Sequence, residues 1–157
     1  MFAKPSMEHQ WLDQLIGHWK LEHNCQMPDG NTITTVGMMN CRSLGGMWLI
    51  CESNGESPDD GPWSTVMSLG FDPDKKQYVG TFLGSMMANL WPYHGVLDAD
   101  GKRLPLYSFG PSFHGNGNAN YRDTIEIVDA DSWLFSSAIQ TEDGTWHQFL
   151  SGKNTRV

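Results

Sequence analysis

The side chains in this 157-residue sequence that could do chemistry are a carboxylate and an imidazole set in apolar, strand-like stretches. Asp123 stands in YRDTIE, where alternation along a strand puts it on one face with Tyr121 and Ile125. A carboxylate desolvated by apolar neighbours has a shifted pKa and suits proton transfer or the binding of a polar group. His23 holds a similar place in KLEHNC, on the face that it shares with Leu21.

One hypothesis from these residues is a small enzyme. An isomerase, cyclase or hydrolase could use Asp123 or His23 as general base, with Tyr93 or Tyr121 as the acid. The alternative for Asp123 is a structural role, in which hydrogen bonds or Arg42 satisfy the carboxylate. The sequence has no Gly-x-Ser-x-Gly elbow and no phosphate-binding loop between a strand and a helix. The chemistry therefore has candidate residues but no recognisable reaction.

Metal and disulfide chemistry are not indicated by the spacing of histidines and cysteines. The six histidines form no His-x-His or His-Glu-x-x-His pattern, and the three cysteines form no Cys-x-x-Cys pair. We therefore expect no metal site and reduced thiols. Cys41 and Cys51 flank one turn and could face each other across two strands.

A short helix and ten strands are predicted to position these residues. Apolar residues recur at helical spacing between Trp11 and Ile16, after a capping Ser6, which predicts a helix over about 6–16. From residue 18 onward the pattern has a period of two. It predicts strands over 18–26, 31–43, 47–54, 63–71, 78–85, 89–97, 103–110, 120–128, 133–141 and 145–153.

The connections between the predicted strands indicate how the strands pair. They are too short for a crossover helix, so the sheet should be an antiparallel meander. Ten strands would leave exposed edges unless the sheet closed on itself. We therefore predict an all-β fold: one closed up-and-down β-barrel of about ten strands, spanning residues 1–157 as a single domain, with the helix capping the closed end.

Successive hairpins of such a barrel lie at alternate ends, and their loops differ in character. Tight polar turns fall at the helix end, whereas longer loops and the apolar turn containing Met86 and Met87 fall at the other. This predicts a mouth to an interior cavity for a small apolar or aromatic molecule, with His23 or Asp123 fixing one polar group. The alternatives are a filled barrel and a homodimer that buries the methionine turn. The predicted ligand-binding residues are Phe82, Met86, Trp91, Tyr93, Tyr121 and Trp146.

The charge balance argues against several classes of partner. The formal net charge is −8, from 10 Lys and Arg against 18 Asp and Glu, which repels phosphate backbones and anionic headgroups. No apolar run approaches the roughly 20 residues of a membrane helix. The first ten residues lack the apolar core of a signal peptide. We therefore expect a cytoplasmic protein without nucleic-acid or membrane partners.

Several motifs resemble known families. Gly17-His18-Trp19 resembles the Gly-x-Trp signature of lipocalins and other calycins, in which the Trp packs across the closed barrel end beneath an Arg from a late strand; Arg156 could fill that role here. The resemblance to the bacterial family known as domain of unknown function fifteen-seventy-nine (DUF1579) spans nearly the whole chain, and it implies a calycin-like barrel but no activity. The segments that carry it are EHQWLDQLIGHW, LGGMWL, LGFDP, VGTFLGSMMANLWPYHG and YRDTIE.

His147 offers one cofactor alternative. It lies on the last predicted strand, and nitrobindin-like ten-stranded barrels hold haem through a His late in the chain, a resemblance of architecture only. The Gly-rich opening pattern of that family is absent here. We therefore expect no cofactor, with haem bound through His147 as the alternative.

Overall fold

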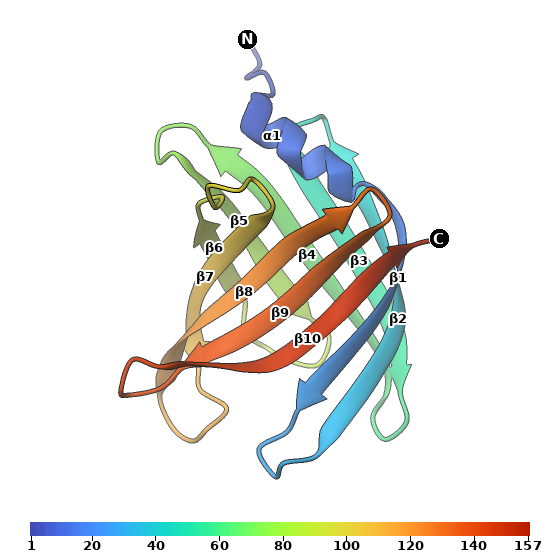
Figure 1. Cartoon of the computed structure of the whole chain (residues 1–157), viewed down its shortest axis with the longest axis vertical. Coiled ribbons are helices and arrows are strands. Elements are labelled where there is room, and N and C mark those ends of the chain that lie inside the picture. Colours follow the sequence, from blue (N-terminus) through green and yellow to red (C-terminus); the bar gives the residue numbers. More distant parts are fainter.

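Ten antiparallel strands close into one barrel in the computed structural model, which describes all residues from Met1 to Val157 (Figure 1). Alternation of apolar and polar side chains along each strand turns one face of the sheet inward and the other to solvent. The strands are β1 (Gly17–Gln26), β2 (Thr32–Leu44), β3 (Trp48–Ser57), β4 (Gly61–Asp72), β5 (Gln77–Gly84), β6 (Trp91–Gly95), β7 (Arg103–Pro111), β8 (Asn118–Asp129), β9 (Ser132–Gln140) and β10 (Trp146–Arg156).

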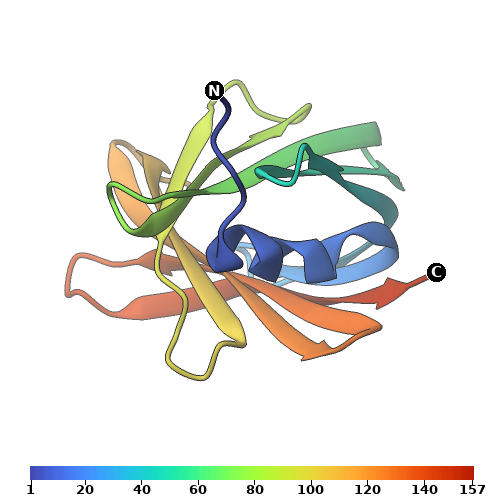
Figure 2. The same ribbon diagram turned by 90° about the horizontal axis from the view of Figure 1, so that it is seen from above.

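The strand order around the barrel follows the sequence, and the circle closes where β1 pairs antiparallel with β10. The closing register sets Trp19 opposite Arg156 and Cys25 opposite Leu150. Seen from above, the strands surround the interior and the helix lies across one end (Figure 2). A closed sheet leaves no unpaired edge. The predicted up-and-down barrel of ten strands is confirmed.

A short helix covers one end of the barrel. It comprises α1 (Met7–Leu12) and a 3₁₀ turn, η1 (Asp13–Leu15), within the predicted range of 6–16. The backbone N–H of Ser6 donates to His9 Nδ1 at 3.0 Å, which fixes the start of α1. Leu12 is buried against the barrel. None of the helices combines the length and apolar character that crossing a bilayer would require.

A tryptophan cluster fills the barrel beneath the helix. The Trp19 indole donates to the Leu15 carbonyl at 2.8 Å and meets Trp133 edge to face, with ring centroids 6.0 Å apart. Arg156 donates to the Ile16 carbonyl at 2.9 Å. These rings belong to a core of 16 buried hydrophobic residues. The helix end of the barrel is therefore packed.

The connections sort between the two ends as the hairpin argument predicts. At the helix end, where α1 and the C-terminus also lie, residues 45–47, 73–76 and 130–131 form short turns and residues 96–102 form a longer connection (Figure 1). The opposite end carries the connections 27–31, 58–60, 85–90, 112–117 and 141–145. Of these, 58–60 is a tight turn, because β3 and β4 extend beyond the predicted strands 47–54 and 63–71, and the longer loop expected there is not found.

The seam between β6 and β7 is the one weak line in the barrel wall. β6 is shorter than the predicted strand over 89–97, and only His94 and Tyr107 are in register across the seam. By contrast, nine residue pairs join β7 to β8. Pro92 on β6 and Pro105 on β7 have no backbone N–H to donate, which explains part of this loss of pairing.

Candidate functional site

The half of the barrel away from the helix encloses a cavity of about 950 Å³. Of its 28 lining residues, 18 are hydrophobic, so its surface is mainly apolar. The lining extends from Leu21 and Trp133 in the interior to residues 86–89 and Phe113 in the loops of the open end. A volume of this size falls in the range of sites that hold drug-sized molecules. The barrel is therefore open inside, and the filled-barrel hypothesis is wrong.

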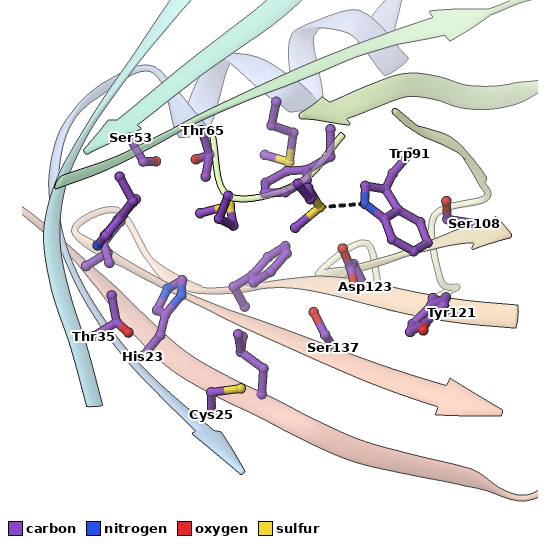
Figure 3. A pocket seen from close by; sticks show the side chains of 18 of the residues that line it. His23, Cys25, Thr35, Ser53, Thr65, Trp91, Ser108, Tyr121, Asp123 and Ser137 are labelled. Carbon is purple, nitrogen blue, oxygen red and sulfur yellow. Dashed lines mark hydrogen bonds between the residues drawn. The ribbon is translucent and has the colours of Figure 1, made fainter. Parts of the chain in front are cut away.

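Most of the residues predicted to form the site do line the cavity. They come from separate elements, and the barrel brings their side chains to one interior (Figure 3). The predicted residues found on the lining are His23 on β1, Phe82 on β5, Met86 in the 85–90 segment, Trp91 and Tyr93 on β6, and Tyr121 and Asp123 on β8.

Trp146 is the exception and lies on the outer face of the barrel. Its ring packs under the Arg122 guanidinium, 4.6 Å from the ring centroid, and against Tyr107 at 6.1 Å. The register between β10 and β9 shifts between Gln148 and Leu150, so residues before the bulge have the opposite orientation from those after it. The prediction that Trp146 lines the cavity is therefore wrong.

The polar group deep in the cavity consists of Asp123 and its hydroxyl neighbours. The Tyr93 hydroxyl on β6 donates a hydrogen bond to Asp123 Oδ2. Ser137 lies opposite Asp123 on β9, and both side chains point into the cavity (Figure 3). Arg42 is not a partner, because it lies on the exposed surface 4.0 Å from Glu52. Of the two structural alternatives for Asp123, hydrogen bonding is the one found.

Burial governs the protonation of this group. Desolvation raises the pKa of Asp123 from its ordinary value, against the opposing hydrogen bonds from Tyr93 and Ser137. Desolvation also raises the pKa of Tyr93 well above its ordinary value, and the charge of Asp123 adds to this effect. Tyr93 is therefore a phenol at neutral pH and serves as a hydrogen-bond donor.

His23 lies on β1, which β10 and β9 separate from the strand of Asp123. Its Nε2 lies 3.3 Å from Oδ1 of Asn154, a fully buried residue on β10. Its ring stacks on Phe135 with centroids 5.9 Å apart and an interplanar angle of 14°. Desolvation lowers the pKa of His23, and the hydrogen bond with Asn154 only partly opposes this effect. His23 is therefore a neutral imidazole at neutral pH.

The segment 85–90 covers part of the mouth. The Trp91 indole donates to Met87 Sδ at 2.9 Å, and the Trp91 ring meets Tyr121 edge to face at 4.9 Å (Figure 3). The Tyr121 hydroxyl donates to the Pro111 carbonyl at 2.7 Å. Met86 is 55% exposed yet also lines the cavity. Flexible methionines are thus in contact with both the solvent and the interior.

Sequence reasoning missed part of the lining. Trp133, Phe135 and Ser137 alternate along β9, and their period of two was the signal that could have identified them. Phe149 and Leu150 are adjacent in the chain and both line the cavity, which simple alternation cannot predict. The remaining missed residues include Met39, Ser53, Thr65, Met67 and Ser108.

Metal ligands and thiols do not gather at this site. No three His, Cys, Asp or Glu side chains lie close enough to share a metal ion. All three cysteines are free, and Cys41 lies opposite Cys51 across β2 and β3, as expected for neighbours around the turn. His147 is exposed and does not line the cavity, so the residues here do not fit a haem held by that histidine.

Two solved structures have the same fold at low sequence identity. Rv2717c from M. tuberculosis is 13% identical, with a TM-score of 0.67 over 98% of this chain and 99% of that one. The S-type phycobiliprotein lyase CPES from Guillardia theta is also 13% identical, with a TM-score of 0.65 over 98% of both chains. No curated protein matches the sequence.

The family assignment comes from the sequence itself. Residues 4–156 match the family described as protein of unknown function (DUF1579), nearly the full length of the chain. The motifs from EHQWLDQLIGHW to YRDTIE all fall within this range. The chain therefore belongs to the DUF1579 family.

Proposed function

We propose that this protein binds a small, largely apolar molecule inside the barrel. The main support for this proposal is the cavity of about 950 Å³ with its mainly apolar lining. Empty apolar volume of this size costs packing energy, so a barrel built only for stability would fill it with side chains. Among the polar side chains on the lining, Asp123 and His23 would orient one polar end of the molecule.

The aromatic side chains on the lining suit a flat ligand. Trp91 and Tyr121 form an edge-to-face pair beside the mouth, and Phe113 packs next to Tyr121 with centroids 6.0 Å apart. Phe82 and Phe135 add two further rings from β5 and β9. Rings in fixed orientations present large apolar contact areas at small entropic cost. The negative net charge of −8 fits a small molecule better than a nucleic acid.

The test is titration with N-phenyl-1-naphthylamine, an apolar fluorophore that is uncharged near neutral pH. Binding inside the barrel should give a saturable rise in probe fluorescence excited through tryptophan. Trp91→Ala should weaken binding about tenfold by removing a cavity wall. Trp146→Ala is the matched control, because Trp146 lies on the outer face and its loss should leave the affinity unchanged.

Two outcomes would contradict the proposal. One is the absence of saturable probe binding, and the other is equal weakening by Trp91→Ala and Trp146→Ala with both variants folded by circular dichroism. Native mass spectrometry of the protein purified from its own host would identify a retained molecule directly. Its mass would also show whether the molecule fits a volume of about 950 Å³.

A second candidate function is proton transfer on the bound molecule, as in an isomerase or cyclase. It is favoured by the hydrogen-bonded pair of Asp123 and Tyr93, because burial raises the pKa of both groups inside an apolar cavity. Asp123 would act as the base and Tyr93 as the acid. Exchange of acidic C–H protons of the bound molecule for deuterium, followed by NMR, should require Asp123 and stop in Asp123→Asn. Equal exchange in both proteins would exclude this role.

A further inference from the structure

The ionisable side chains that line the cavity can supply a negative charge but no positive charge at neutral pH. Asp123 is the only acidic residue on it, and neither Lys nor Arg lines it. The remaining titratable groups are His23 on β1, Cys25 on β1, Cys51 on β3, Tyr93 on β6 and Tyr121 on β8. None of these is cationic at neutral pH, given a neutral His23. The cavity therefore offers a potential negative charge and no positive one.

The Asp123 carboxyl also has unused capacity to accept hydrogen bonds. An ionised carboxylate has about four acceptor positions on its two oxygens. The hydroxyls of Tyr93 and Ser137 fill part of this capacity. Its other neighbours supply no cation: Leu106 is opposite it on β7, and Ser108 follows on the same face of that strand. The side chain points into the open volume, so a bound molecule can supply the missing donors (Figure 3).

A negatively charged ligand would be repelled by Asp123 in this cavity. A carboxylate ligand in this cavity would face Asp123 without any compensating cation, in a poorly solvated volume where like charges repel strongly. The net charge of −8 would also repel it during approach, while it attracts cations. Both effects disfavour an anionic ligand and favour a cationic one.

We propose that the cavity selects apolar molecules that carry a protonated amine, held by Asp123, over carboxylic acids of the same skeleton. This inference rests on the proposed binding function and adds the chemical class of the ligand. The ammonium would donate to the open positions of the Asp123 carboxylate, while Tyr93 and Ser137 hold that carboxylate in place. The apolar body of the molecule would extend towards Trp91 and the mouth.

The test uses three probes with one skeleton: naphthalen-2-ylmethylamine, naphthalen-2-ylmethanol and naphthalene-2-carboxylate. Isothermal titration calorimetry at pH 7 should rank the amine first and the carboxylate last, with about tenfold or more between these two. In Asp123→Asn the advantage of the amine over the alcohol should disappear. Glu22→Gln, an equal charge change on the outer face of β1, is the matched control and should keep the wild-type ranking.

A pH series provides a test that needs no substitution at Asp123. Acidification protonates this carboxyl, so the affinity for the amine should fall by more than the affinity for the alcohol. His23 gains charge in acid and would repel the amine as well, so the series is repeated in His23→Gln. The affinity for the amine must also fall on acidification in His23→Gln.

The possible results separate the two proposals. Equal binding of all three probes, or an amine preference that survives in Asp123→Asn, overturns the ligand class but leaves the binding function intact. If Asp123→Asn does not fold, the probe ranking in the wild type and the pH series in His23→Gln decide the question. Binding of none of the three probes rejects the cavity as a site for such molecules, and the inference with it.

Discussion

The Arg156 guanidinium lies over the Trp19 indole, 4.2 Å from the ring centroid, and so joins the last strand to the first. The same guanidinium donates to the carbonyls of Ile16 and Ala130 at 2.9 and 2.8 Å. One side chain thus connects the end of the helical segment, the β8–β9 turn and the barrel closure. Its contacts are also inaccessible to the shorter, non-planar head of a lysine.

Replacing this arginine should destabilise the barrel more than replacing a similar arginine on the outer face. Arg156→Ala is expected to lower the free energy of unfolding by about 2–3 kcal/mol, because it leaves backbone carbonyls unpaired and removes the cation–π contact. Arg122→Ala, which removes a cation from Trp146, should cost about 0.5–1 kcal/mol. Urea unfolding of both variants measures the difference, and equal costs would show that Arg156 is not a special closure residue.

Asp123 should make the stability of the protein fall as pH rises. Its pKa is raised in the folded state, so the folded protein holds this proton more tightly than the unfolded chain, where the pKa is near 3.8. The stability contribution is fully present below 3.8 and is lost as pH rises through the folded-state pKa. Each pKa unit of difference corresponds to about 1.4 kcal/mol.

The measurement is the difference in unfolding free energy between Asp123→Asn and the wild type as a function of pH. Taking this difference cancels the opposite slopes of exposed carboxylates such as Asp143, whose pKa is lowered to about 2 by hydrogen bonds from Thr141 and Thr145. The variant should gain stability relative to the wild type between acid and neutral pH. A flat difference would show that burial does not disfavour the charged carboxylate.

Two glycines on β5 should respond very differently to a methyl group. A Cβ on Gly80 would lie 1.8 Å from the Ser68 backbone carbonyl oxygen, which cannot move without shifting β4. A Cβ on Gly84 would meet Met86 Sδ at 2.3 Å, the end of a flexible side chain in an irregular segment. We expect Gly80→Ala to cost about 3 kcal/mol or more and Gly84→Ala less than about 1 kcal/mol. Thermal unfolding of the two variants would reveal an error in this ranking.

The cysteines should differ in their reaction with iodoacetamide. Cys25 is partly exposed at the open end, and desolvation raises its pKa. Cys51 is buried, and its pKa is raised well above the ordinary value, first by its hydrogen bond with Cys41 and then by desolvation. Because the thiolate is the reactive form, Cys25 should be alkylated before the other two. Bound ligand should slow this reaction, since Cys25 lines the cavity. Peptide mapping by mass spectrometry with and without ligand provides the test.

The fold could be predicted from this sequence because its signals are local. Period-two alternation and short turns determine an antiparallel meander, and the cost of exposed edges then favours closure. Alternation divides each strand into two faces, and an inward Trp19 on β1 and the cost of exposing large aromatic side chains on β6 then select the inner face. His23, Trp91 and Asp123 lie on the interior as expected. What could not be predicted depends on non-local geometry. The bulge on β10 reverses the orientation of Trp146, and no residue type in HQFLSG marks it.

The site was less accessible to sequence reasoning than the fold. Whether the interior is filled depends on how the volumes of side chains from all ten strands add up, and no single segment carries that sum. The partner of Asp123 could be narrowed only to Tyr93 or Tyr121, because Tyr93 reaches it from a strand 30 residues away in the chain. The roles of the lining residues in ligand binding remain predictions for the experiments above.

The sparse pairing between β6 and β7 should make this part of the barrel wall the first to open locally. Local opening of the barrel wall costs the least free energy where the fewest inter-strand hydrogen bonds must break. Amide hydrogens along this seam should therefore exchange with deuterium earlier than those of β8. Tyr93 belongs to β6, so the phenol that donates to Asp123 lies on the strand with the weakest pairing in the barrel. The hydrogen bond between Tyr93 and Asp123 can thus open through a movement of β6 that leaves the rest of the barrel paired.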